Sequence, residues 1–235
     1  MKKILLLVGI LVSLAAANVV FGQITGVITY EVKVNLHRRL PPDRADMKAM
    51  LPEFRVTKDQ LFFNDNESLY KPLIEDEEEE EMGGGGMRIR MKQPNTEIYL
   101  NQSTGELVSK QEFMGKDYLI EDSVKVSPWK FGTETKMIQG YECRQAFYTD
   151  EIQLNLNGNP TAEKREITAW YTDKIRPSLG PERFNTLPGA VLAVDINSEE
   201  RVIVARKIEL IELKRLALQE SISLEDYLTS YQSQR

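Results

Sequence analysis

Few residues in this chain could carry out covalent or metal-assisted catalysis. His37 is the only histidine and Cys143 the only cysteine, so Ser-His or Cys-His catalysis would have to use His37. One residue of each type is too few for a structural zinc site, and the chain has no G-x-S-x-G motif. Although 36 residues are Asp or Glu, no spacing singles out a catalytic carboxylate pair. We therefore predict a protein that is not an enzyme and has no catalytic residue.

A single cysteine cannot form a disulfide within its own chain. Cys143 could therefore be a buried apolar side chain, half of an intermolecular bridge or a reactive thiol. Because free cysteine is among the most buried residue types, we predict a buried, unreactive thiol.

The segment 75–92 is the one stretch whose composition could make a metal site. Seven consecutive acids, Glu75 to Glu81, precede four glycines and a basic end. The acids could contact a cation or a basic partner, and Met82, Met87 and Met91 could hold a soft metal ion. A run of acids lacks the spaced ligands and fixed turn of a calcium site. Because like charges repel and glycine is costly to order, we predict a solvated loop insertion, with no metal or cofactor.

The first 22 residues have the pattern of a secretory signal peptide. Lys2 and Lys3 precede an apolar run, and small residues precede a cleavage position after Gly22. The apolar run is shorter than a membrane span, and no cysteine near the cut could take a lipid. We therefore expect a soluble exported protein, periplasmic or secreted, without a stable membrane anchor. Removing two lysines changes the net charge from −6 to −8, which argues against nucleic acid as a partner.

Period-2 alternation of apolar residues dominates the remaining chain and predicts β-strands. Expected strands are 24–36, 54–63, 87–92, 97–100, 107–113, 116–120, 141–148, 165–171, 190–196 and 201–213. Because little helix separates them, the pattern favours one antiparallel meander of about eight to eleven strands. We predict a mainly β fold: a single curved antiparallel sheet or partial barrel, forming one domain over residues 23–213.

Two helical patterns accompany the strands. Asp43 could cap a short helix that ends at Leu51. Apolar residues at helical spacing between Leu224 and Tyr231 predict a C-terminal helix within the tail 214–235. This helix could close the edge of the core, or the tail could dock on another protein.

Two segments carry more aromatic and turn residues than a plain surface needs. A predicted hairpin around Gln139-Gly140 follows Trp129, and a long irregular crossing follows the strand that ends at Tyr171. Aromatic side chains of the crossing should pack over the mouth of the sheet. The candidate residues for binding a ligand or partner are Trp129, Trp170, Tyr171, Phe184, Leu187, Pro188 and Gly189.

Several motifs, in a fixed order, carry a family resemblance. They are Asn66–Tyr70, Glu134–Cys143 with Ala146, Trp170–Thr172 with Ile175, Gly180-Pro181 with Phe184, and Thr186–Val191. The chain resembles the GLPGLI family, also called the Porph_ging family, of exported proteins from Bacteroidota. In the naming hexapeptide Leu187, Pro188 and Gly189 are identical, and Thr186 replaces the first glycine.

The resemblance implies a periplasmic β-rich protein without an assigned reaction, often encoded beside outer-membrane receptors. We therefore expect a binding or interaction protein that is accessory to an outer-membrane receptor or another envelope protein. The alternative is a carrier that holds an apolar or peptide ligand in the concave face of the sheet. Large inward side chains filling that face would favour the first function, and an apolar cavity of roughly a few hundred cubic ångströms the second.

Overall fold

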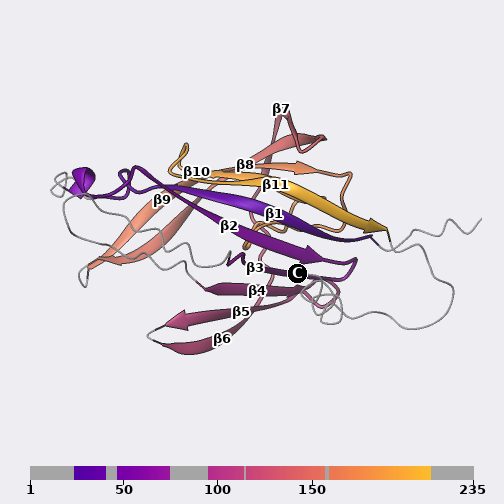
Figure 1. Cartoon of the computed structure of the whole chain (residues 1–235), viewed down its shortest axis with the longest axis horizontal. Helices are drawn as coiled ribbons and strands as arrows, with labels where there is room; N and C mark the ends of the chain where they lie inside the picture. Colours follow the sequence, from indigo (N-terminus) through magenta and orange to yellow (C-terminus); the bar gives the residue numbers. More distant parts are fainter. Residues whose placement is uncertain (1–23, 41–46, 75–94, 114, 157–158, 213–235) are drawn as a thin grey trace, which may run out of the picture.

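The computed structural model describes residues 24–40, 47–74, 95–113, 115–156 and 159–212. These residues form one antiparallel sheet of eleven strands (Figure 1). The strands are β1 (Ile24–Asn35), β2 (Phe54–Phe63), β3 (Glu67–Pro72), β4 (Thr96–Asn101), β5 (Glu106–Phe113), β6 (Lys116–Ser123), β7 (Lys130–Ile138), β8 (Tyr141–Leu156), β9 (Asn159–Thr172), β10 (Ala190–Ile196) and β11 (Arg201–Glu212). The prediction of a mainly β fold with a single antiparallel sheet is confirmed.

The strands follow one another around the sheet in chain order, with one break. The order is β6-β5-β4-β3-β2-β1-β11-β10-β9-β8-β7, so the first strand pairs with the last. The two free edges are β6 and β7, at the bottom and top of Figure 1. The residues that join them, 124–129, can span at most about 25 Å, so the two edges must curl toward each other. The sheet is therefore a strongly curved half-barrel that is not closed.

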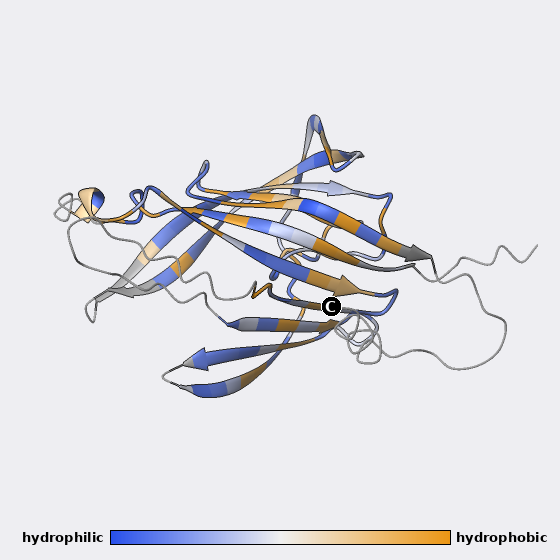
Figure 2. Cartoon of the chain, viewed as in Figure 1, coloured by the Kyte–Doolittle hydropathy of each residue, from blue (hydrophilic) through white to orange (hydrophobic). Residues whose placement is uncertain are grey.

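Alternation along the strands divides the inner face into an apolar end and a polar end. On β2, Arg55, Thr57 and Asp59 share one face with Leu61 and Phe63, because alternate side chains of a strand point the same way. Leu61 and Phe63 are fully buried. Figure 2 shows β2 changing from hydrophilic to hydrophobic toward its end. The hydrophobic core therefore occupies one end of the half-barrel.

Helix is nearly absent from the described residues. The expected helix 43–51 is described only from Met47 onward, where a single 3-10 turn covers Met47–Ala49. An α-helix there is wrong, since Pro52 disfavours helical geometry at Leu51. The predicted signal peptide (1–22), the loop 75–92 with Met82, Met87 and Met91, and the C-terminal helix (214–235) lie outside the described residues. Within the described ranges, no helix has the length and apolar character that a membrane crossing requires.

The predicted strand boundaries differ from the structure in two ways. β3 was not expected from the sequence, and the β8–β9 hairpin is much longer than predicted. Figure 1 shows this hairpin projecting past the other strands. Its outer half consists mainly of polar residues, so apolar alternation does not mark it.

Cys143 lies on β8 with no exposed surface, as predicted. Burial raises the pKa of its thiol to about 11, although the Lys136 ammonium opposes the shift. Because the thiolate is the reactive form, alkylation of the native protein at pH 8 should be at least about 100-fold slower than alkylation of the unfolded protein. A time course of iodoacetamide labelling followed by mass spectrometry measures both rates. Equal rates would contradict the burial of this side chain.

A concave cavity bounded by a crossing segment

Residues 173–189, which we call the crossing segment, run between β9 and β10. Four of its apolar side chains are buried in the main core: Ile175, Leu179, Phe184 and Leu187. Its backbone also bonds to β10, because the Val191 N–H donates to the Leu179 carbonyl at 2.8 Å. The crossing segment is therefore part of the core rather than a surface loop.

Two glycines allow the crossing segment to pack this closely. A Cβ at Gly180 would lie 2.0 Å from the Phe184 carbonyl oxygen. A Cβ at Gly189 would lie 2.0 Å from the Thr172 carbonyl oxygen, and Gly189 has a φ of +134°. Residues with side chains rarely adopt this φ, and both overlaps involve backbone atoms that cannot rotate away. The Gly-Pro and Leu-Pro-Gly motifs thus have a structural explanation.

Polar side chains connect the crossing segment to both halves of the sheet. Glu182 forms an ion pair with Arg201 of β11, with Nη1 and Oε2 3.0 Å apart. Arg183 donates to Asp122 of β6 at 2.9 Å. The indole Nε1 of Trp129, in the link between the free edges, donates to Thr186 Oγ1 at 3.0 Å. The crossing segment therefore connects β6 and the link after it to β11.

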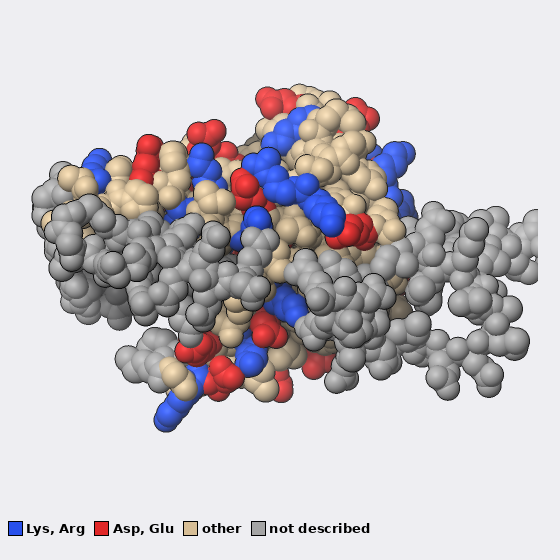
Figure 3. Space-filling model, viewed as in Figure 1, with Lys and Arg blue, Asp and Glu red and all other residues tan. Residues whose placement is uncertain are grey.

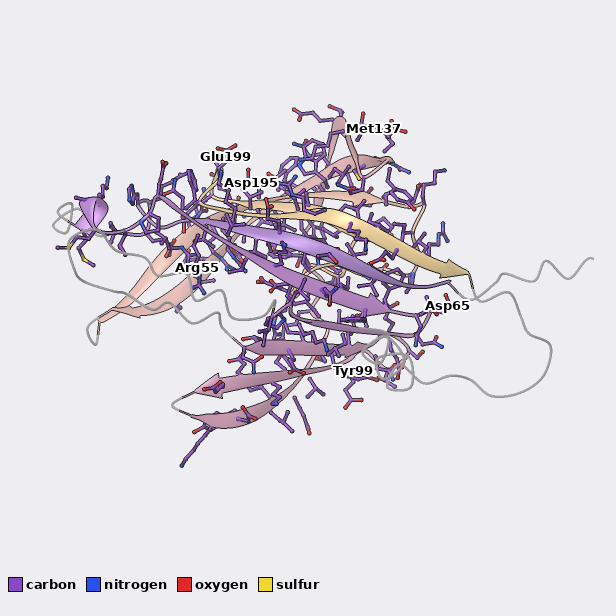
Figure 4. All side chains as sticks on the ribbon, viewed as in Figure 1. Arg55, Asp65, Tyr99, Met137, Asp195 and Glu199 are labelled. Carbon is purple, nitrogen blue, oxygen red and sulfur yellow. The ribbon has the colours of Figure 1, made fainter. Side chains whose placement is uncertain are left out.

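A cavity of about 640 Å³ lies on the polar end of the inner face, beside the crossing segment. Its walls come from β1–β6, β8, β9 and β11, and Glu182, Arg183, Phe184 and Asn185 of the crossing segment form part of the lining. Figure 4 places Arg55 and Asp65 at opposite ends of β2. Arg55 lines the cavity, so the cavity lies at the end of the half-barrel away from the β2–β3 turn.

The lining combines apolar and charged side chains. Val32, Val34, Ile98, Leu107 and Phe184 are among its apolar members. Six lining residues are basic and three are acidic: Arg39, Arg55, Lys125, Arg165, Arg183 and Arg201 against Asp59, Asp150 and Glu182. The cavity thus carries more positive than negative groups, although the whole chain has a net charge of −6.

The basic residues of the lining differ in their ion pairs, and Arg39 pairs with Glu200 outside the lining at 3.1 Å. Arg165 and Arg201 each pair with an acid of the lining, Asp150 at 3.0 Å and Glu182. Lys125 and Arg183 instead share one carboxylate, Asp122, at 3.4 and 2.9 Å. Two positive charges, those of Lys125 and Arg183, therefore share a single negative charge beside β6.

A buried hydrogen bond lies deeper in the cavity wall. The Tyr70 hydroxyl donates to Asp59 Oδ2 at 2.6 Å, and both residues are less than a tenth exposed. Burial, and then the Asp59 carboxylate, raise the pKa of Tyr70 well above its usual value. Tyr70 therefore stays protonated at neutral pH and keeps the Asp59 carboxylate satisfied.

The structure separates the seven predicted binding residues. Phe184 lines the cavity, and Trp129 packs edge-on against the lining residue Tyr148 with ring centroids 4.6 Å apart. Leu187 and Gly189 are buried in the core, whereas Pro188 between them is exposed. Tyr171 is buried on β9, and Trp170 lies beneath the Lys136 ammonium, 4.4 Å from the ring centroid.

Sequence reasoning did not identify the charged residues of the cavity. Arg55, Thr57 and Asp59 alternate along β2 in the same phase as the buried Leu61 and Phe63. This shared phase was the feature of the sequence that could have shown that the three polar residues face inward. His37, the one histidine, contacts the Leu51 carbonyl at 2.9 Å and does not line the cavity. Among the described residues, no group of three or more His, Cys, Asp or Glu could hold a metal ion.

The crossing segment lies inside the part of the chain that matches a known family. Residues 129–193 match the Porph_ging family model. That family is described as a protein of unknown function. The Porph_ging match confirms the predicted resemblance and runs from Trp129 to β10, so it includes Gly180 and Gly189. A comparison with curated proteins gives no significant match.

One solved structure shares the fold beyond the Porph_ging segment. The structure titled "Structure of PNGF-II in C2 space group" aligns over 86% of this chain and 29% of its own, with 16% identity and a TM-score of 0.50. The structure of PNGF-II in P21 space group aligns over 84% and 29%, with 16% identity and a TM-score of 0.49. The chain thus spans less than a third of the PNGF-II chain, and the likeness shows the fold alone.

Proposed function

We propose that this protein is a non-enzymatic binding protein of the cell envelope that holds an amphipathic, acid-bearing ligand in the concave cavity. The observation that carries the proposal is the cavity of about 640 Å³ on the inner face of the half-barrel. Sites for small molecules and short peptides usually have volumes of about 300–1,000 Å³.

The residues that line the cavity support a ligand with both an acidic group and an apolar part. Lys125 and Arg183, which share one carboxylate, could receive an acidic group of the ligand. Phe184, Ile98 and Leu107 offer apolar contact on the same cavity surface. A short peptide with a free carboxylate, or a small acid with an apolar body, has both features.

The inner face is partly filled and partly hollow, which bears on the two expected functions. The crossing segment fills the apolar end, and the cavity occupies the polar end. The hollow supports the carrier function, with a ligand more polar than the purely apolar one considered from the sequence. A role beside an outer-membrane receptor or envelope assembly is a second candidate, favoured by the exposed apolar side chains of the free edges, which include Leu119 and Phe131.

Filling the cavity tests the binding site. Thr57 lines the cavity, whereas its neighbour Val56 is 44% exposed on the other face of β2. The probe is the fluorophore 8-anilinonaphthalene-1-sulfonate, which joins apolar rings to an anionic group. Thr57→Trp should weaken its saturable binding at least about tenfold, and Val56→Trp should leave it within about twofold. Circular dichroism checks that both variants are folded, and equal binding by the two variants would contradict the proposed site.

A further inference from the structure

β6 has one side without a strand partner among the described residues. It pairs only with β5, over all eight residues and without a register shift. Its outer backbone N–H and carbonyl groups therefore form a straight edge on which another strand could pair. By contrast, the register of β7 shifts between Phe131 and Thr135, which interrupts the other free edge.

The charged residues of β6 lie toward its two ends and leave its middle without a charge. The strand contains no proline and no bulge, and its one basic residue, Lys116, is at its start. Tyr118, Leu119 and Ile120 are 47%, 71% and 43% exposed. An exposed apolar edge of this kind is a template for pairing with a strand of another chain.

The two faces of β6 differ in charge. Ile120 lies opposite the buried Ser109 of β5, so Tyr118, Ile120 and Asp122 belong to the concave face. Asp117, Leu119 and Glu121 belong to the convex face, where two acids flank one apolar side chain and Asp117 pairs with Lys110 of β5 at 3.2 Å. Figure 3 shows acidic and basic side chains intermixed on the lower part of the visible surface, where β5 and β6 lie.

This pattern specifies the side chains of a fitting strand. Residues opposite Tyr118, Leu119 and Ile120 should be apolar, and residues opposite Asp117 and Glu121 should be basic. The required pattern is basic, three apolar, basic. It is the same in both chain directions.

A second copy of β6 fits this edge poorly. Antiparallel pairing with Leu119 opposite Leu119 places Asp117 opposite Glu121 twice. A shift of two residues in either direction, which keeps the same faces together, places an acid opposite Leu119 instead. Like charges directly opposite one another destabilise a strand pair. The charge pattern therefore favours a different, basic partner over a homodimer.

We infer that the outer edge of β6 is a docking site for an extended segment of another protein, which adds a twelfth strand through three apolar residues bracketed by Lys or Arg. The bound strand would extend the sheet across the opening toward β7. This site is separate from the proposed ligand site, because Tyr118, Leu119 and Ile120 do not line the cavity.

A synthetic peptide tests the docking site on the full mature chain. The peptide is acetyl-Thr-Lys-Val-Val-Val-Lys-Thr-amide, and its binding is measured by calorimetry together with hydrogen–deuterium exchange. Binding should slow amide exchange within residues 116–123. An analogue with all three valines N-methylated cannot pair its backbone there, and an analogue with Glu in place of Lys meets like charge. Each analogue should bind at least about tenfold more weakly.

Matched protein variants locate the site. Leu119→Lys should weaken peptide binding at least about tenfold, whereas Val126→Lys should not, since Val126 is 81% exposed in the link after β6. Absent binding, equal binding of the N-methylated analogue, or equal binding by both variants would overturn the docking site. A concentration-dependent dimer that Leu119→Lys abolishes would overturn the choice of a different protein as the partner.

Discussion

Replacing Gly189 by alanine should destabilise the protein by at least about 3 kcal/mol. The added Cβ would lie 2.0 Å from the Thr172 carbonyl oxygen, and the backbone φ of +134° excludes most side chains. Relief would require β9 and the crossing segment to separate, which would open the core between them. Urea denaturation followed by circular dichroism measures the change in the free energy of unfolding.

Gly105 provides the control for this substitution. It also has a positive φ, +71°, but a Cβ there would meet no atom within 4 Å. Gly105→Ala should therefore cost only about 1–2 kcal/mol, for the backbone conformation alone. If the two substitutions destabilise the protein equally, the close approach at Gly189 does not exist in solution.

Replacing Leu187 by alanine should cost about 2–5 kcal/mol. The Leu187 side chain is 1% exposed and packs in the main core. Its removal leaves a cavity that the surrounding backbone cannot fill. Differential scanning calorimetry measures the loss as a lower melting temperature.

Substitution of the neighbouring Pro188 is the control that distinguishes a packing role of the motif from a binding role. Pro188 is exposed, so Pro188→Ala should change stability by no more than about 1 kcal/mol, mainly through the unfolded chain. A near-normal stability of Leu187→Ala would mean that the motif is not a core element. The hexapeptide would then be better explained as a surface for a ligand or partner.

Strand alternation predicted most of the sheet. The bounds of β2 and β10 coincide with those expected, because the turn residues Asn64-Asp65-Asn66 and Asn197-Ser198 directly follow them. β3 was missed because Leu69 and Tyr70 are flanked by polar residues and a proline. The position of the opening between β6 and β7 could not be predicted, since it depends on which distant strands pair.

The sequence also identified the crossing segment but not its role. Gly180, Leu187 and Gly189 are compatible with either a binding loop or a core element. Which of the two roles is correct depends on the Phe184 and Thr172 carbonyls. Only folding brings these carbonyls close to Gly180 and Gly189. The charged residues of the cavity were missed for a related reason. Arg55 and Asp59 resemble the solvent face of an amphipathic strand until the curvature of the sheet encloses them.

The two ends of the inner face therefore differ: one is filled by the core, and the other contains the cavity. The crossing segment, with the glycines of the Porph_ging match, builds and closes the apolar end. Strands β1–β6, β8, β9 and β11 build the polar cavity, to which Arg55, Thr57 and Asp59 contribute from outside the Porph_ging match.

Native mass spectrometry of the protein purified from the cells that produce it tests the proposed ligand site most directly. Wild-type protein and Val56→Trp should each carry a bound molecule with an acidic group, released on denaturation, and Thr57→Trp should show the mass of the bare chain. A bare mass for the wild-type protein, or the same bound molecule on Thr57→Trp, would contradict the account.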